Sequence, residues 1–252
     1  NLAFNIILKF SVYNISFNYK LLPSLAFIIF FIFFIKLGFW QLDRADQKKI
    51  INMAFVERQN QSPIQLNKET IQMPIKDIIW HRVSMRGEFL NDKNIILDNQ
   101  IVQEKAGFLI YTPFKILDSN KVILINRGWY PLSNSRKDIP NIPPIKEIQT
   151  IEGEISQMPS SGISLGKVIT EKLDESSFRL QKMDYEVLSS LISKDLMRYV
   201  VKLKNPIFDK TYVLDSGMPV PDSDKNYGYA FQWFAMAFTL FIIFIRLGVK
   251  KK

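Results

Sequence analysis

The sequence contains no cysteine and a single histidine, His81. The absence of thiols excludes disulfides, thiolate metal sites and cysteine nucleophiles. One imidazole excludes a metal site built from several histidines, and it leaves only His81 for a Ser-His-Asp triad. The phosphate-binding pattern Gly-x-x-x-x-Gly-Lys-Ser/Thr and the dinucleotide pattern Gly-x-Gly-x-x-Gly are also absent. We therefore expect a protein that is not an enzyme and has no metal site.

Acidic side chains are fewer than basic ones, and the 252-residue chain carries a formal net charge of +9. The lysines and arginines are scattered among aspartates and glutamates, which is typical of a solvated basic surface rather than of a nucleic-acid-binding face. We predict no nucleic-acid partner. Hydrophobic residues make up 47% of the chain, and the longest apolar runs lie near its two ends.

These runs, residues 21–40 and 227–247, each have the length of roughly 20 residues that a membrane-spanning helix requires. The first contains an unbroken aliphatic and phenylalanine-rich stretch over residues 25–35, longer than the core of a signal peptide and without a small-residue cleavage site after it. Tyr227, Tyr229 and Trp233 stand at the start of the second run, where aromatic rings favour the membrane interface. The sequence thus predicts two uncleaved spans in contact with the lipid bilayer.

The basic tail Lys250, Lys251 and Lys252 follows the second span directly, which marks the cytoplasmic side of a membrane. Two spans place both chain ends on one side and the segment between them on the other. We expect a cytoplasmic segment over residues 1–20, spans over 21–40 and 227–247, an extracytoplasmic domain over 41–226, and a cytoplasmic tail over 248–252. The arginine-poor start favours a bacterial inner membrane with a periplasmic domain, or the mitochondrial inner membrane if the source is eukaryotic.

The segment between the spans predicts a mostly β (α+β) domain, a small antiparallel barrel or sandwich. The first helix should continue beyond the membrane to about residue 59, with Pro63 as its latest end. Alternating short strands follow, including a hairpin over residues 108–116 and 121–126, in which Pro113 indicates an edge or a bend. Residues 184–194 predict a short helix with Asp184 as its N-cap.

Three clusters could carry function. Trp40 and Arg44 share a helix face where the first span ends, and serve either as an interfacial anchor or as a contact site. The stretch Asn126-Arg127-Gly128-Trp129-Tyr-Pro131 follows a strand, and is either a strand-ending turn or a site where Arg127 binds a carboxylate. Gln232 lies inside the second span, where a polar side chain faces another helix or a ligand. His81, Met218 and Met236 are conceivable iron ligands, although His81 could equally be an ordinary strand residue.

Taken together, several short motifs resemble the SURF1 family of cytochrome c oxidase assembly factors. They occur in family order between the two spans, and they are Leu37-Gly-x-Trp-Gln-x-x-Arg44, Arg82-Val-x-x-x-Gly-x-Phe89, Gly107-Phe-x-x-x-Thr-Pro-Phe114, Ile123-Leu-Ile-Asn-Arg-Gly-Trp-Tyr-Pro131 and Tyr229-Ala-x-Gln-Trp-Phe234. The resemblance implies an inner-membrane protein that assists maturation of the oxidase catalytic subunit together with other assembly factors.

The resemblance also implies haem a as a cofactor, because some bacterial members are thought to present haem a to the catalytic subunit. The family's candidate iron ligand is a histidine three residues before the Tyr-Ala of the last motif, and this chain has Asn226 there. Asparagine is a poor ligand for haem iron. The candidates for a cofactor contact are then His81, Arg127, Tyr229 and Trp233. The candidates for partner contacts are Trp40, Arg44, Asn126, Arg127, Gly128, Trp129, Pro131, Tyr229, Gln232 and Trp233.

Two alternatives belong to other functional classes. A two-span membrane sensor, or ligand-binding protein with an extracytoplasmic domain, would share the architecture, although the short basic tail leaves no room for a signalling output. A membrane-anchored hydrolase would need carboxylates such as Asp98 and Asp215, which the sequence does not pair. We rank both below an assembly factor.

Overall fold

The computed structural model describes residues 7–12, 15–117, 119–133, 140–159, 170–205, 213–214 and 219–251. The chain forms two compact units. One, the helix unit, consists of Asn1–Ala54 and Met218–Lys252, and the other, the barrel unit, consists of Phe55–Gly217. A single helix, α1 (Leu21–Asn60), contributes residues to both. The expected arrangement, two terminal apolar helices and a mostly β domain formed by the residues between them, is confirmed.

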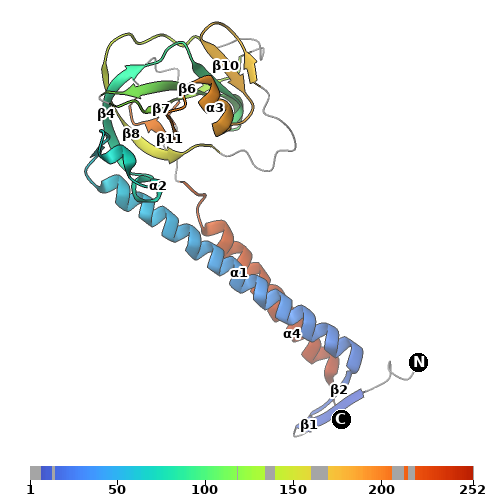
Figure 1. Ribbon diagram of the computed structural model, residues 1–252. Helices are drawn as coiled ribbons and strands as arrows, with labels where there is room; N and C mark the ends of the chain where they lie inside the picture. Colours follow the sequence, from blue (N-terminus) through green and yellow to red (C-terminus); the bar gives the residue numbers. More distant parts are fainter. Residues whose placement is uncertain are drawn as a thin grey trace. The chain divides into compact units, whose positions relative to one another are not determined.

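In the helix unit, α1 lies beside α4 (Asp224–Gly248), as Figure 1 shows. Their contact is largely aromatic: the rings of Phe27 and Phe244 stack with centroids 4.0 Å apart, and those of Phe39 and Phe234 meet edge to face at 5.4 Å. Gly38 makes room for this packing, because a Cβ atom at Gly38 would lie 2.5 Å from the ring of Phe234. Small residues allow close helix approach in the same way in membrane helix pairs.

Both helices are long and apolar enough to span a membrane, and only 11% of the most apolar 18-residue stretch of each is buried. The core helix of a soluble protein would bury most of that stretch, so these side chains suit contact with lipid. The predicted extension of the first helix is confirmed: α1 runs on to Asn60, through a segment that lacks glycine and proline, and ends before Pro63.

Three short strands complete the helix unit and were not predicted. They are β1 (Ile7–Val12), β2 (Ile15–Lys20) and β12 (Val249–Lys251), in the antiparallel order β1-β2-β12. Strand β2 leads directly into α1, and β12 directly follows α4. The sheet therefore joins the two ends of the helix pair that carry the chain termini.

In the barrel unit, five strands close into a ring with the order β4-β8-β11-β7-β6 and back to β4. They are β4 (Arg82–Phe89), β6 (Lys105–Ile116), β7 (Val122–Pro131), β8 (Gln149–Gln157) and β11 (Leu196–Leu203). All neighbours in the ring are antiparallel except β7 and β11, which are parallel. The predicted hairpin is confirmed as β6 and β7, and the predicted small barrel is confirmed with one parallel pair in its wall.

Further elements extend the ring. Strand β3 (Ile64–Gln65) pairs with β4, while β5 (Asn94–Val102) pairs with β6 and is followed outward by β10 (Ser177–Leu180) and β9 (Thr170–Lys172). One edge of β6 thus pairs with β5 as far as Tyr111 and with β4 from Phe114 onward. Pro113 lies at this change of partner and lacks the N–H that a ladder bond would need there. Strand β6 is therefore not an edge strand; the proline marks a break in the pairing on one side.

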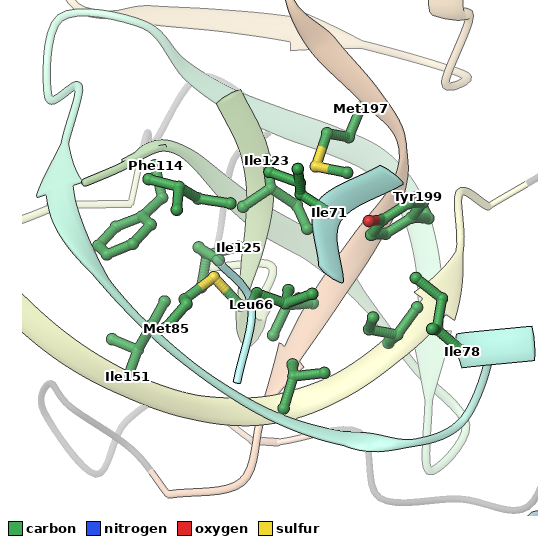
Figure 2. Packing of buried hydrophobic residues seen from close by; sticks show 14 of the residues in the cluster. Leu66, Ile71, Ile78, Met85, Phe114, Ile123, Ile125, Ile151, Met197 and Tyr199 are labelled. Carbon is green, nitrogen blue, oxygen red and sulfur yellow. The ribbon is translucent and has the colours of Figure 1, made fainter. Parts of the chain in front are cut away.

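The core fills the inside of the ring with aliphatic, methionine and aromatic side chains (Figure 2). A short 3-10 helix, η2 (Thr70–Gln72), and α2 (Ile75–Ile78) cover it, because Ile71 and Ile78 belong to the same buried cluster. A second cluster packs α3 (Tyr185–Leu191) against β5, β7 and β11. Asp184 caps α3 as predicted, since its carboxylate accepts the backbone N–H of Val187 at 3.1 Å.

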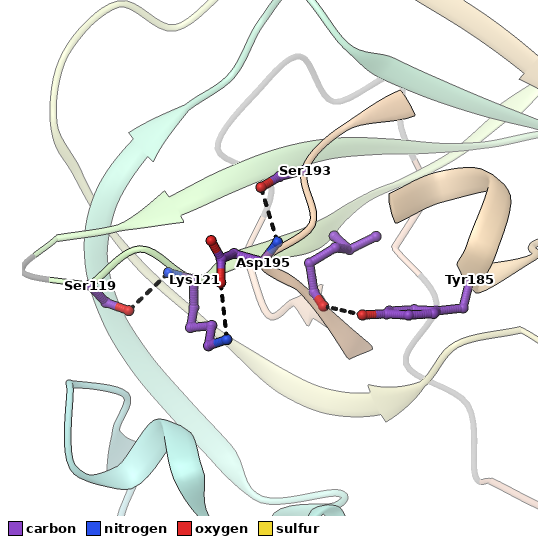
Figure 3. A network of polar contacts seen from close by, with 6 residues as sticks. Ser119, Lys121, Tyr185, Ser193 and Asp195 are labelled. Carbon is purple, nitrogen blue, oxygen red and sulfur yellow. Dashed lines mark hydrogen bonds and ion pairs between the residues drawn. The ribbon is translucent and has the colours of Figure 1, made fainter. Parts of the chain in front are cut away.

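Polar contacts hold the turn of the β6–β7 hairpin to the segment that joins α3 to β11 (Figure 3). Lys121 forms an ion pair with Asp195, with Nζ and Oδ1 3.2 Å apart, and its backbone N–H donates to Ser119 Oγ. Tyr185 on α3 donates its hydroxyl hydrogen to the carbonyl of Leu196. These contacts fix the start of β11 beside the start of β7, where the two strands run parallel.

Candidate functional site

The motif Asn126-Arg127-Gly128-Trp129 forms a β-bulge in strand β7. The register of β7 on β6 shifts there, because Ile110 pairs with Gly128 while Tyr111 pairs with Asn126. Gly128 has φ of 117°, a left-handed value that favours glycine, and the side-chain oxygen of Asn126 accepts its N–H at 2.9 Å. The bulge in the barrel wall therefore explains why this motif contains Asn126 and Gly128: the glycine adopts the left-handed backbone, and the asparagine accepts its N–H.

Arg127, the extra residue of this bulge, is only 1% exposed. Its Nη1 donates to Thr112 Oγ1 at 3.4 Å and its Nη2 donates to the carbonyl of Pro143 at 3.2 Å. Thr112 in turn donates to Asn94 Oδ1. The guanidinium thus links β6, β7 and the chain after β7 from inside. The guanidinium is closed off from solvent, so a carboxylate could reach it only if the barrel wall opened. The role of Arg127 in partner or cofactor contact stays a prediction.

Trp129 and Pro131 occupy the last part of β7. The indole N–H of Trp129 donates to the carbonyl of Gln100 at 3.1 Å, and its backbone pairs with Val213 in both directions. Pro131 pairs with Gly107 at the end of the hairpin. Trp129 thus connects β7 to β5 and to the chain after β11. Because it is also only 5% exposed, its role in this structure is packing.

His81 follows a strained turn between α2 and β4. Trp80 has φ of 64°, and its carbonyl accepts a hydrogen bond from Gln59 Nε2 at 2.6 Å. Arg58 donates to the carbonyl of Ile79 and lies over the Trp80 ring, with its guanidinium carbon 5.9 Å from the centroid. The last turn of α1 therefore holds Trp80 in a backbone conformation that tryptophan rarely adopts.

The imidazole of His81 is half-buried, and its Nδ1 is enclosed with no hydrogen-bond partner among the described residues. Desolvation, followed by the positive charge of Arg58, lowers the pKa of His81 below its usual 6.5. The neutral imidazole that results is the form that ligates metals. Of the two methionines considered with it, Met236 belongs to the helix unit and Met218 lies outside the described residues.

The predicted contact residues at the end of the first span are exposed. The side chain of Trp40 is 54% exposed. Arg44 is also exposed and donates to Gln47 Oε1 at 2.9 Å, while Gln47 donates to Asp43 on the same helix. Both residues therefore remain available for lipid or a partner.

The predicted contact residues on α4 point in different directions. Trp233 is half-buried and its ring lies 5.8 Å from that of Phe34 on α1. Tyr229 is 51% exposed, and Gln232 is exposed with no hydrogen-bond partner within the described part of the chain. The structure therefore uses Trp233 to pair the two helices, whereas Tyr229 and Gln232 face away from that contact.

Asn226, at the position of the family's candidate iron ligand, forms a polar cluster with Gln41 and Lys48 of α1, here called the Asn226 cluster. Its Oδ1 accepts a hydrogen bond from Lys48 Nζ at 2.7 Å, and its Nδ2 donates to Gln41 Oε1 at 2.7 Å. Both ends of the amide are thus used to bridge α1 and α4. The first and last sequence motifs meet here, because Gln41 belongs to one and Asn226 stands just before the other.

The residues of the Asn226 cluster do not fit ligation of haem iron. Neither amide is a usual iron ligand, and the Lys48 ammonium would stand beside a positively charged metal. Within the described ranges, no group of three or more histidine, aspartate or glutamate side chains could hold a metal ion. Position 226 therefore offers no ligand for haem iron.

A further short motif, Gly162-Ile-Ser-Leu-Gly166, has the Gly-x-Ser-x-Gly spacing of a hydrolase nucleophile elbow. It lies outside the described residues. The elbow requires a strand before the serine and a helix after it, with the histidine later in the chain. Here the next described element is strand β9, and the single histidine, His81, precedes the motif. The motif alone therefore does not support a triad.

Comparison with known proteins matches the chain to the family model described as the SURF1 family over residues 28–238. A SURF1-like protein of Rickettsia bellii is 30% identical over 232 residues, which cover 88% of each chain. One from Rickettsia prowazekii is 28% identical over 226 residues, 85% of each chain, and one from Dictyostelium discoideum is 24% identical over 263 residues, 88% of this chain and 95% of the relative. The match begins inside α1 and ends inside α4, so it includes the barrel and the larger part of each apolar helix, and this chain belongs to the SURF1 family.

Proposed function

We propose that this chain is an assembly factor for cytochrome c oxidase that binds the oxidase catalytic subunit while it matures. The family is known for cytochrome c oxidase assembly factors. The observation that carries the proposal is the family match over residues 28–238, which covers the barrel together with the larger part of each apolar helix. Two of the motifs that supported the resemblance also occupy defined structural features: one forms the β7 bulge of the barrel unit, and another contributes Gln41 to the Asn226 cluster of the helix unit.

The proposal includes a location. The two apolar helices anchor the chain in a bacterial inner membrane, with the barrel in the periplasm and the lysine-rich end in the cytoplasm. The support comes from Lys250, Lys251 and Lys252 after α4 and from the bacterial relatives. A periplasmic barrel could meet the domains of an oxidase subunit on the same side, and the helices could meet its membrane part.

We propose that the chain acts by contact with other proteins, without breaking or forming covalent bonds. The Asn226 cluster supports this role, because the position of the family's candidate iron ligand is used for helix pairing. Other assembly factors are further partners in this proposal. Haem a would then reach the catalytic subunit without being ligated at position 226.

The docking surface for the catalytic subunit is the face of α4 that carries Gly228, Gln232, Ala235 and Thr239. These residues are spaced by four, three and four positions, so they lie on one side of a helix. All four are exposed, and a Cβ atom at Gly228 would meet nothing within 4 Å. Trp233 and Phe234 face α1 instead. A glutamine amide within a membrane span is stabilised by a hydrogen bond to a neighbouring helix, and small residues beside it let that helix approach.

To test the proposal, the chain is expressed in a bacterium that lacks its own SURF1 protein. The haem a content of the oxidase and the co-purification of its catalytic subunit with this chain are then measured. We expect the chain to restore both. Gln232→Leu should weaken co-purification by about 3- to 18-fold, the range for an interhelix hydrogen bond in membranes, and Gln232→Asn should retain part of it. Phe238→Leu is the control, because Phe238 is also exposed on α4 but keeps an apolar side chain.

The outcomes separate the role from the surface. Failure of the membrane-inserted chain to raise the haem a content of the oxidase, or to co-purify with the catalytic subunit, in a deletion strain that lacks assembled oxidase would contradict the assembly role. Restored assembly together with unchanged co-purification of Gln232→Leu would leave the role standing and reject this face of α4 as the docking surface.

A further inference from the structure

The sheet β1-β2-β12 lies at one end of the helix pair, where both apolar spans stop (Figure 1). Strand β2 ends at Lys20, directly before α1, and β12 begins at Val249, directly after α4. The predicted spans, residues 21–40 and 227–247, therefore start or stop next to this sheet. A span of about 20 apolar residues crosses the hydrocarbon core of a bilayer. With these helices in a membrane, the sheet stands at the boundary between hydrocarbon and water.

The strand register divides this sheet into an apolar face and a basic face. Residues that pair across strands share a face, and so do alternate residues along one strand. Phe10 pairs with Phe17, and Phe17 pairs with Val249. By this register, one face holds the aliphatic and aromatic residues Leu8, Phe10, Val12, Ile15, Phe17, Tyr19 and Val249. The other face holds the polar and basic residues Lys9, Ser11, Ser16, Asn18, Lys20 and Lys250. The two exceptions, Ile7 and Lys251, stand at strand ends.

Two neighbouring side chains of β2 show how the two faces are directed. The ring of Tyr19, on the apolar face, stacks with the ring of Phe244 on α4, with centroids 4.3 Å apart. The same ring lies over Gly248, where a Cβ atom would overlap it. Lys20, the next residue and on the basic face, is exposed. The apolar face is therefore continuous with the apolar surface of the helices, and the basic face is the opposite one.

The acids of the helix unit lie far from the lysines of this sheet. Residues 1–42 and 225–252 contain neither aspartate nor glutamate. The first acid after each segment of apolar helix is Asp43, 22 residues from Leu21, or Asp224, 24 residues from Gly248, which is about 33 and 36 Å at 1.5 Å per residue. Both distances exceed the Debye length of about 8 Å at physiological ionic strength. The positive charge of the sheet is therefore not neutralised within the helix unit. The sheet carries the four lysines Lys9, Lys20, Lys250 and Lys251.

A bilayer that contains anionic lipid matches both faces. Apolar residues at the surface of a membrane are stabilised by the boundary of the hydrocarbon, and cations clustered beside a span attract anionic headgroups. An acidic protein partner would match the basic face alone and would leave the apolar face in water, at a cost in free energy. The combination of both faces at the end of two spans therefore favours lipid over a protein.

We propose that β1-β2-β12 lies in the membrane interface, with its apolar face against the hydrocarbon, and that the lysines of its basic face bind anionic phospholipid headgroups. Because β2 and β12 continue into α1 and α4, a sheet held at the surface would fix the depth of both helices in the bilayer. The inference rests on the membrane anchoring proposed above. It depends neither on the role in oxidase assembly nor on the docking face of α4.

The position of the sheet is tested with the full chain in nanodiscs of equal parts phosphatidylglycerol and phosphatidylcholine. The natural chain has no cysteine, so one introduced cysteine carries a bimane label at one position. Phe10→Cys and Ser11→Cys label opposite faces of β1, and Ile29→Cys labels an exposed position of α1 within the span. We expect lipids brominated in their acyl chains to quench the emission at positions 10 and 29, and iodide in the water to quench it at position 11.

The headgroup preference is tested by native mass spectrometry, which counts the lipids that the chain retains from the same nanodiscs. We expect phosphatidylglycerol to be enriched over phosphatidylcholine. Lys20→Gln, and Lys9→Gln combined with Lys20→Gln, should lower this enrichment by up to about fivefold for each lysine removed. Lys49→Gln removes the same charge from an exposed position of α1 beyond the predicted span and should leave the enrichment unchanged.

The outcomes separate the sheet from the anchoring. Equal quenching at positions 10 and 11 by brominated lipid, with position 29 quenched, would overturn the inference and leave the helices in the membrane. A label at position 29 that brominated lipid does not quench would reject the anchoring and the inference with it. Protection of position 10 from both quenchers would mean that a second copy of the chain covers the apolar face, and would overturn the inference as well. So would equal enrichment of phosphatidylglycerol in the unmodified chain and both sheet variants.

Discussion

At the scale of single residues, His81 gives the chain a distinct response to acid. Desolvation, with a smaller effect of Arg58, lowers its pKa in the folded protein below 6.5, while in the unfolded chain the pKa returns to about 6.5. Between these two values the unfolded state binds a proton that the folded state does not. The stability that His81 contributes is therefore complete above pH about 6.5 and is lost as the pH falls through the lowered pKa.

We expect the free energy of unfolding to decrease when the pH is lowered from about 7.5 to about 5, and His81→Gln to remove most of this decrease. Chemical unfolding followed by circular dichroism at several pH values measures it. His81 is the only histidine, so few other side chains titrate in this window. Equal pH dependence in the unmodified protein and the variant would show that burial does not disfavour the imidazolium.

Other properties of single residues were beyond prediction from the sequence. The cap at Asp184 is an exception and was predictable, because the aspartate and the backbone N–H of Val187 that it accepts are only three positions apart in the sequence. The burial of Arg127 was not, since its acceptors Thr112 and Pro143 come from separate parts of the chain. Trp80 adopts a left-handed backbone for a similar reason: Gln59 and Arg58 hold the segment Ile79–Trp80, and each bonds to a residue 21 positions later in the sequence. Local patterns contain no information about such partners.

At the scale of elements, the pairing of α1 with α4 depends on Gly38. A Cβ atom there would lie 2.5 Å from the Phe234 ring, whereas one at Gly228 would meet nothing within 4 Å. We expect Gly38→Ala to destabilise the helix pair by about 1–3 kcal/mol, the usual cost of overpacking. Gly228→Ala should change stability by less than about 1 kcal/mol, because alanine at an open helix position is favourable by itself.

Disulfide formation between cysteines placed at Phe27 and Phe244 measures this effect. Their rings stack at 4.0 Å, and the natural chain has no cysteine that could interfere. Cross-linking should fall in the Gly38→Ala background and persist in the Gly228→Ala background. An equal yield in both backgrounds would mean that the Phe234 ring moves aside at no cost.

The elements themselves differ in how far the sequence predicts them. Both apolar helices follow from composition and length, and so does the extension of α1 to Asn60. The β6–β7 hairpin follows from two alternating runs around a polar turn. Closure of the ring does not follow from the sequence pattern, because it depends on two long-range pairings: β6 changes its partner from β5 to β4 along one edge, and β7 lies parallel to β11. The sheet β1-β2-β12 joins the two ends of the chain, and no local pattern indicates that pairing.

At the scale of the whole molecule, the question is whether the protein carries haem a. The Asn226 cluster binds α1 to α4 through both ends of one amide, with the Lys48 ammonium 2.7 Å from the amide oxygen. A histidine placed at position 226 would meet the same ammonium, which would repel the iron and compete for the ring nitrogen. A ligand at position 226 would therefore require a change at Lys48 as well.

We expect the full chain, purified from a host that makes haem a, to contain far less than one haem a per chain in a pyridine-haemochrome assay. Asn226→His alone should change this little, whereas Asn226→His combined with Lys48→Ala should raise the haem content several-fold. Gln47→His is the control, since Gln47 is exposed on α1 and adds an imidazole outside the cluster. One haem a per unmodified chain would contradict this expectation. The iron would then need another ligand, and because His81 is the only imidazole of the chain, loss of that haem in His81→Ala would place the iron in the barrel unit.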